Sequence, residues 1–74
     1  RFDSRFVNDI FHMIRTINIE KDVTVFLVEQ NAKKALEISQ HGYVMENGTI
    51  VMREKSSALL ADDKVRAAYL GEGV

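Results

Sequence analysis

The segment Val23–Val28, which reads VTVFLV, constrains the fold most because it is apolar at every position except Thr24. Such residues favour strands, and a strand that is apolar on both faces is typical of a sheet covered on both sides. We therefore expect a buried, parallel-type strand here. The chain has only 74 residues and no Cys, so it buries little surface and has no disulfide to stabilise it. At the edge of a sheet, a strand of this kind would expose unpaired backbone groups and invite aggregation. We therefore expect Val23–Val28 to be part of a larger sheet.

A helix is expected ahead of this strand, from about Ser4 to Asn18, with Asp3 or Ser4 as its N-cap. Apolar residues recur there at helical spacing: Phe6, Val7, Ile10, Phe11, Met13, Ile14 and Ile17. They form two adjacent rows, so we expect a wide buried face. Residues Ile19–Asp22 would form a polar connector to the strand.

A second helix is expected directly after the strand, over Ala32–Gln40, with Asn31 as its N-cap. Its apolar side would carry Ala32, Ala35, Leu36 and Ile38. The dipeptide His41-Gly42 would end it, because glycine readily adopts the left-handed conformation found at helix ends.

The dipeptide Asn47-Gly48 tolerates the positive φ angles of a tight turn and predicts a hairpin between strands Tyr43–Glu46 and Thr49–Arg53. The order helix, strand, helix, strand, strand, helix is an α/β arrangement. We expect residues 1–74 to form one partial domain.

The last helical segment should begin near Ser56 or Ser57, and Asp62 should cap a second short turn. Four residues of that turn would face inward: Val65, Ala68, Tyr69 and Leu70. Gly71 and Gly73 would then end the ordered chain.

The charge balance excludes some classes of partner. Lys and Arg total 10 against 11 for Asp and Glu, a net charge of -1, so nothing favours nucleic acid or an anionic membrane. No apolar run approaches the roughly 20 residues of a membrane span, and the charged start, Arg1–Arg5, does not resemble a signal peptide. We expect a soluble, cytoplasmic chain that needs a partner, without direct membrane insertion.

The polar triplet Glu29-Gln30-Asn31 follows the expected strand and marks a candidate ligand site. In the alternative structural interpretation, Glu29 is a solvated neighbour, Asn31 is a helix cap and Gln30 bonds to nearby backbone. For the isolated chain we favour this alternative.

Other residue types give weaker candidates. His12 and His41 match no common metal-ligand spacing, and zinc needs three or four convergent ligands, so no metal site is expected. His12 should be an exposed helix residue and His41 part of a helix end. Asp62 and Asp63 fit helix capping and the helix dipole better than an acid pair. Three methionines are expected to fill the core: Met13, Met45 and Met52.

Taken together, these motifs resemble a known family. The stretch VTVFLVEQNAKKALEISQHGYVMENGTIVM and the ending LLADDKVRAAYLGEG are similar to the C-terminal region of ABC transporter ATPases. The ATP-binding subunit of branched-chain amino-acid importers is the most similar. The resemblance extends from about Phe2 to Gly71, because FVNDIFHMIRTIN is similar to the helix after that family's D-loop. Its most specific elements are Val28-Glu29-Gln30-Asn31 and Ala68-Tyr69-Leu70-Gly71.

The resemblance implies a nucleotide-sensing role for Gln30. The wider family most often has a His at this switch position, where it contacts the γ-phosphate. A Gln donates a hydrogen bond there but cannot titrate near neutral pH. Two local departures are Glu54 and Lys55, which replace a Gly and a Thr of the family. Asp63 replaces a usual Pro.

The resemblance also implies that ATP and Mg serve the full-length family. The family's phosphate loop ends in Gly-Lys-Ser/Thr, but the glycines here, at 42, 48, 71 and 73, begin no such motif. We therefore expect no catalytic residue and no cofactor in the isolated chain, and no ATP hydrolysis by it. A transporter subunit of this kind would be peripheral to the inner membrane and would dock on membrane subunits. The alternative is a stand-alone interaction module derived from such a fragment. It would form homodimers or larger oligomers that cover the strand Val23–Val28 and the wide apolar face of the first helix.

Overall fold

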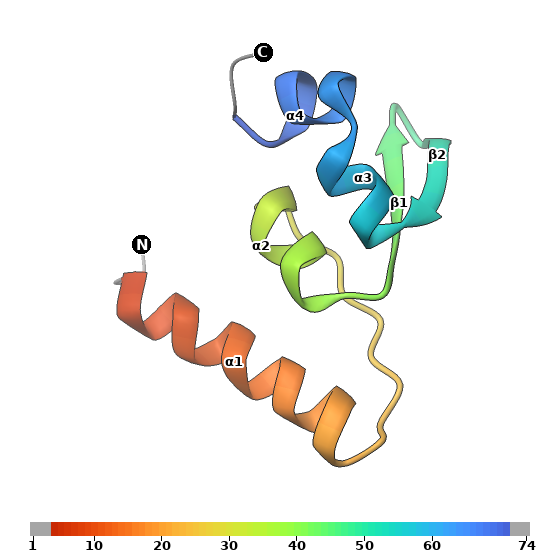
Figure 1. Ribbon diagram of the computed structural model, residues 1–74. Helices are drawn as coiled ribbons and strands as arrows, with labels where there is room; N and C mark the ends of the chain where they lie inside the picture. The colour runs from red at the N-terminus through yellow and green to blue at the C-terminus, as the bar shows by residue number, and fades with distance from the viewer. Residues whose placement is uncertain (1–3, 72–74) are drawn as a thin grey trace.

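The computed structural model describes residues 4–71. The elements within them are α1 (Ser4–Glu20), α2 (Ala32–Ile38), β1 (His41–Glu46), β2 (Thr49–Lys55), α3 (Ser56–Ala61) and α4 (Asp63–Tyr69). Figure 1 shows α2, α3 and α4 beside the β1–β2 hairpin, while α1 lies apart at the end of a long extended segment. Asp3 and Gly73 lie outside the described residues, as does the side chain of Ser4, so the expected cap of α1 does too.

Strands β1 and β2 pair antiparallel and form the sheet of the described chain. Asn47 (φ 52°) and Gly48 (φ 77°) occupy the turn between them, both with positive φ. The register shifts between Val44 and Met45, so Val51 has no directly opposed residue. Such an extra residue is a β-bulge, which bends and twists the strand that carries it.

The strand expected over Val23–Val28 is wrong for this chain. The segment is extended but belongs to no sheet, and Phe26 and Val28 are 88% and 82% exposed. The Val23 N–H donates to the Ile17 carbonyl at 3.3 Å, and Asn18 Nδ2 donates to the Val23 carbonyl at 2.8 Å. A strand needs a neighbour to satisfy its backbone, and the two strands of the described chain already pair with each other.

The expected end of α2 at His41-Gly42 is also wrong. The helix stops at Ile38, Ser39 is extended (φ -108°, ψ 161°), and His41 and Gly42 open β1. A Cβ at Gly42 would lie 2.7 Å from a methyl group of Leu36 and 2.7 Å from one of Leu59. The glycine therefore permits close packing of the hairpin on the helices, rather than a left-handed helix end.

The hydrophobic core lies between the three short helices and the hairpin. Its buried members are Leu36, Leu59, Val65 and Leu70, and the partly buried residues packed against them are Ala32, Met52, Leu60 and Tyr69. Val65 and Leu70 thus face inward as expected, whereas Ala68 is exposed. Met52 fills core space as expected, whereas Met13 and Met45 are exposed.

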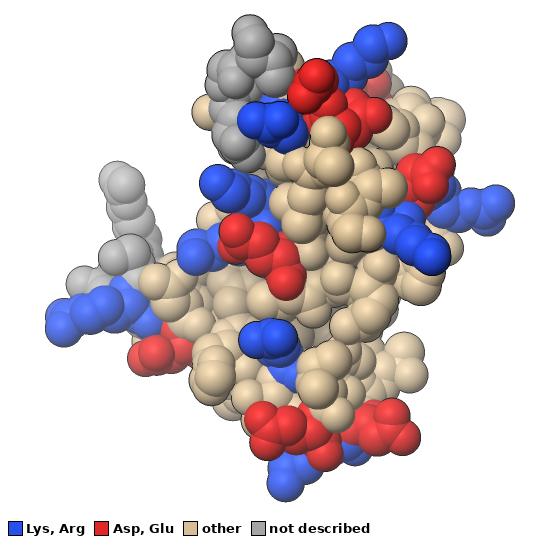
Figure 2. All heavy atoms as spheres, viewed as in Figure 1, with Lys and Arg blue, Asp and Glu red and all other residues tan. Residues whose placement is uncertain are grey.

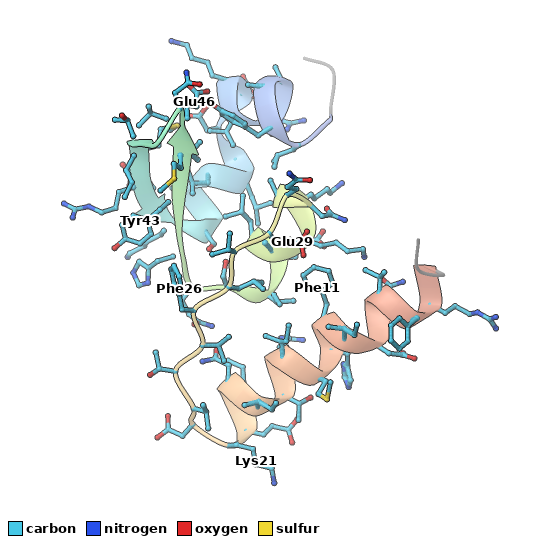
Figure 3. All side chains as sticks on the ribbon, turned by 180° about the vertical axis from the view of Figure 1, so that it is seen from behind. Phe11, Lys21, Phe26, Glu29, Tyr43 and Glu46 are labelled. Atoms are coloured by element: carbon cyan, nitrogen blue, oxygen red, sulfur yellow. The ribbon has the colours of Figure 1, made fainter. Side chains whose placement is uncertain are left out.

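Helix α1 contributes little to this core. Phe11 is its buried residue, and Figure 3 shows the ring between α1 and α2. Three other members of the expected wide stripe are exposed: Phe6, Met13 and Ile17. The helix also runs to Glu20, two residues beyond the expected end. About half of its apolar stripe therefore remains uncovered.

Hydrogen bonds fix the junctions between the short elements. Ser56 begins α3, and its N–H donates to the Gln40 carbonyl at 3.0 Å. The hydroxyls of Ser39 and Ser56 lie 2.7 Å apart and share a hydrogen bond. Because Ser56 is buried, this bond satisfies a polar group that would otherwise be costly to bury. The two bonds join the end of α2 to the start of α3.

Candidate functional site

The polar triplet Glu29-Gln30-Asn31 lies where the extended segment meets α2, and Figure 3 shows Glu29 beside the beginning of that helix. Glu29 Oε1 accepts hydrogen bonds from the N–H groups of Gln30 at 2.9 Å and Asn31 at 3.1 Å. Amide groups at a helix start have no partner within the helix, and negative charge is favourable there. The carboxylate of Glu29 therefore satisfies two amides of its own chain.

Asn31 acts as the N-cap of α2, as the sequence predicted. Its Oδ1 accepts from the Lys34 N–H at 3.4 Å, and its carbonyl accepts the first helical bond, from the Ala35 N–H at 3.1 Å. A capping side chain satisfies one of the free amides of the first turn. The position of the triplet is thus tied to the start of α2.

All three residues of the triplet are exposed, but Gln30 differs from its two neighbours, whose side chains accept hydrogen bonds from nearby backbone amides. Its backbone N–H bonds to Glu29, but within residues 4–71 its side-chain amide makes no hydrogen bond. An amide side chain offers two N–H donors and a carbonyl acceptor. The geometry therefore leaves the Gln30 amide available to a ligand or to another part of a protein.

The triplet by itself does not fit Mg-ATP. The amides of Gln30 and Asn31 already bond to a carboxylate, and a phosphate would meet its negative charge. Among residues 4–71 no group of three or more His, Asp or Glu side chains could hold a metal ion. Figure 2 shows acidic and basic side chains interspersed over the visible face.

The remaining candidate residues, two histidines and two aspartates, lie in or at the ends of helices and strands and form no metal site with one another. His12 is exposed on α1, as expected, whereas His41 begins β1 instead of ending a helix. Asp62 caps α4, because its Oδ1 accepts from the Val65 N–H at 2.9 Å. Asp63 lies in the first turn of α4 and forms an exposed ion pair with Arg66 at 3.2 Å.

One link in the structure has no signal in the sequence. The Tyr69 hydroxyl donates a hydrogen bond to Glu46 Oε2 and so joins α4 to the end of β1. This bond, together with burial and the nearby negative charge, raises the pKa of Tyr69 above its usual 10.0. The two residues are 23 positions apart, and nothing in their local pattern indicates that they meet.

The outer surface of the hairpin is also apolar and uncovered. Its exposed large residues are Tyr43, Met45, Ile50 and Val51. Within the described residues, no helix is both long and apolar enough to cross a membrane. The chain therefore exposes apolar side chains on three elements: the hairpin, α1 and the extended segment.

Comparisons with known proteins confirm the resemblance inferred from the motifs. No protein-family model matches the chain. It is 52% identical over 65 residues, or 88% of its length, to the high-affinity branched-chain amino acid transport ATP-binding protein BraG of Pseudomonas aeruginosa. It is 31% identical over 67 residues, or 90% of its length, to the probable branched-chain amino acid transport ATP-binding protein LivF of Archaeoglobus fulgidus.

A third relative is a probable ABC transporter ATP-binding protein of Azorhizobium caulinodans, which is 27% identical over 66 residues, or 89% of this chain. In each case the chain spans only a minor part of the relative. The share is 28% of the Pseudomonas and Archaeoglobus proteins and 23% of the Azorhizobium protein.

Proposed function

We propose that this chain is the C-terminal part of the ATP-binding subunit of a branched-chain amino acid ABC importer. The observation that carries the proposal is the 52% identity to the Pseudomonas protein over 88% of the chain. Because the matched stretch is 28% of that protein, ATP binding with Mg and the coupling to transport would require the longer polypeptide. That polypeptide would lie in the cytoplasm, peripheral to the inner membrane, and would dock on the membrane subunits of the transporter.

In this proposal Gln30 is the residue that senses the nucleotide. Its side chain is exposed at the end of the extended segment, and Glu29 and Asn31 anchor the backbone on both sides of it. A fixed backbone with an available side-chain amide suits a residue that must donate a hydrogen bond to a phosphate oxygen. Glu29 and Asn31 would position Gln30 and would not contact the reacting atoms.

The isolated chain is proposed to be inactive. No glycine in it is followed by Lys, so it does not carry the Gly-Lys-Ser/Thr loop that cradles phosphates in such ATPases. The Glu29 carboxylate also bonds to the amides of Gln30 and Asn31. We expect no hydrolysis of Mg-ATP by the purified 74-residue chain above a protein-free control, and steady hydrolysis would contradict this.

The proposal is tested in a chimera in which this chain replaces the matched stretch of the Pseudomonas relative. The chimera should hydrolyse Mg-ATP, and Gln30→Ala should lower kcat by roughly 100-fold, the effect of losing one donor to a transition state. Gln40→Ala is the matched control, because it removes the same exposed amide at the other end of α2 and should leave kcat unchanged. Equal rates for the two variants would refute the role of Gln30, and a folded chimera without hydrolysis would refute the assignment to the family's activity.

A second candidate function is an interaction module that forms homodimers or larger oligomers. The observation that favours it is the exposed apolar segment around Phe26 and Val28, because exposed apolar patches commonly mark protein–protein contacts. Light scattering at micromolar concentration distinguishes the two candidates. A monomeric mass would reject the module, and a dimeric mass that Phe26→Asp converts to a monomer would support it.

A further inference from the structure

The turn between β1 and β2 places a side-chain amide next to an unbonded backbone nitrogen. Asn47 and Gly48 are both exposed, and within residues 4–71 neither the Gly48 N–H nor the Asn47 side-chain amide makes a hydrogen bond. A Cβ placed on Gly48 would meet nothing within 4 Å, so no neighbouring group of the described chain crowds this part of the turn. Both groups are therefore open to solvent water.

These two groups can react with each other. Once hydroxide removes the N–H proton, the Gly48 nitrogen attacks Asn47 Cγ, and the bond between Cγ and the side-chain nitrogen breaks. The leaving nitrogen takes a proton from water and departs as ammonia, which regenerates the hydroxide. A five-membered succinimide ring remains, and one water molecule opens it at either of its two carbonyls. The net change replaces the side-chain NH₂ with OH, and water is the only co-reactant.

The surroundings of the four asparagines single out Asn47. Gly48 has no side chain to hinder ring closure, whereas each of the other three is followed by a residue with a Cβ. Asn8 and Asn18 lie within α1, where the backbone N–H groups are held in helical hydrogen bonds. The side chain of Asn31 is held as the cap of α2.

We propose that Asn47 deamidates spontaneously in the folded chain through a succinimide with Gly48, and that the products weaken the hairpin and its link to α4. Ring opening at one carbonyl gives aspartate at position 47. Opening at the other gives isoaspartate, in which the main chain runs through the former side chain and is one carbon longer. This modification goes beyond the proposed function and does not depend on ATP.

The products change the turn in two ways. Asn47 and Gly48 form a two-residue loop with φ angles of 52° and 77°, and such a loop fits one backbone length between the paired Glu46 and Thr49. An added main-chain carbon disturbs that pairing. Both products also add a negative charge beside Glu46, which accepts the Tyr69 hydroxyl bond, and like charges repel. Figure 3 shows Glu46 at the tip of the hairpin, beside α4.

Peptide mass spectrometry of the 74-residue chain, incubated in mildly alkaline buffer, tests the reaction. Asn47 should convert at least about tenfold faster than each of the other three asparagines, and chromatography of the peptides should separate isoaspartate from aspartate. A parallel sample in urea shows what the unfolded chain does. Conversion of Asn47 no faster than that of the other asparagines, or conversion in urea alone, would overturn the inference.

Residue-resolved amide hydrogen exchange tests the effect on the hairpin. After conversion, the amides of β1 and β2 should exchange at least about tenfold faster than in the fresh chain. Asn47→Gly is the matched control, because it keeps the positive φ of the turn and has no amide to react. Its exchange should not change during the same incubation. Unchanged exchange in the converted parent, or an equal change in the control, would overturn the proposed effect.

The result does not depend on a single preparation. If the control variant does not fold, the parent before and after conversion decides the effect on the hairpin. If the chain does not fold alone, the chimera with the Pseudomonas relative takes its place, and an Asn47 that stays intact there overturns the inference.

Discussion

Adding one methyl group at Gly42 is expected to destabilise the fold. The Cβ of Gly42→Ala would lie 2.7 Å from Leu36 Cδ2 and 2.7 Å from Leu59 Cδ1, far inside the ordinary carbon–carbon contact of about 3.5–4.0 Å. Leu59 is 1% exposed, so its side chain has no free space to move into. The hairpin or one of the two leucines must therefore shift.

Two opposing effects set the size of the change. Overpacking a core costs about 1–3 kcal/mol, whereas replacing Gly by Ala in a strand interior gains roughly 0.5–1 kcal/mol. The steric term wins because neither close contact involves an exposed, flexible side chain. We expect the free energy of unfolding to fall by about 1–2 kcal/mol, or roughly 4–8 °C in Tm for each kcal/mol.

Urea unfolding followed by circular dichroism measures this effect in Gly42→Ala and in the same change on a Leu36→Ala background. Leu36→Ala removes one of the two clashing methyl groups and leaves space beside position 42. The cost of Gly42→Ala should therefore be smaller in that background, as a double-mutant cycle would show. An equal cost in both backgrounds, or a net stabilisation by Gly42→Ala alone, would refute the packing argument.

Three further changes test the C-terminal half of the chain. Leu59→Ala should lower the free energy of unfolding by about 2–5 kcal/mol, because it leaves a cavity in the core, and urea unfolding would measure it. Asp62→Ala should cost about 1 kcal/mol through loss of the cap bond to Val65, more than Asp63→Ala, whose ion pair is exposed. Tyr69→Phe should destabilise the chain at neutral pH, and its difference from the parent should disappear as pH rises above 10.0. The pKa of Tyr69 is raised in the folded chain, so the stabilisation is complete below the unfolded value and is lost as pH rises through the folded value.

Each of these results has a contradicting outcome. A loss below 1 kcal/mol for Leu59→Ala would mean that the core rearranges around position 59. Equal losses for the two Asp variants would show that Asp62 does not act as a cap. A Tyr69→Phe difference that persists at high pH would show that the Tyr69 hydroxyl bond to Glu46 is not its source.

Features set by neighbouring residues could be predicted from the sequence. Asn31 and Asp62 cap α2 and α4 as expected, because a cap depends on a short side-chain oxygen and the next three amides. The position of the polar triplet ahead of α2 followed from the same local rule. These predictions required no knowledge of what packs against the helices.

Features that depend on distant partners could not be predicted in this way. The composition of Val23–Val28 indicates a strand, but a strand forms only with a neighbour, and the described chain offers none. The sequence predicts a helix end at Gly42. Its contacts with Leu36 and Leu59 are tertiary, so the local sequence around Gly42 carries no sign of them. The link between Tyr69 and Glu46 was missed for the same reason.

The location of the core along the chain has a consequence for its synthesis. The members of the core, from Leu36 to Leu70, all lie after the extended segment. At roughly 5–20 residues per second, several seconds pass between the emergence of Leu36 from the ribosome and that of Leu70. Phe26 and Val28 are outside the ribosome during that interval and remain exposed afterwards. Nascent chains therefore expose an apolar segment before the core has formed. Chaperone binding around Phe26 would protect them from aggregation at that stage.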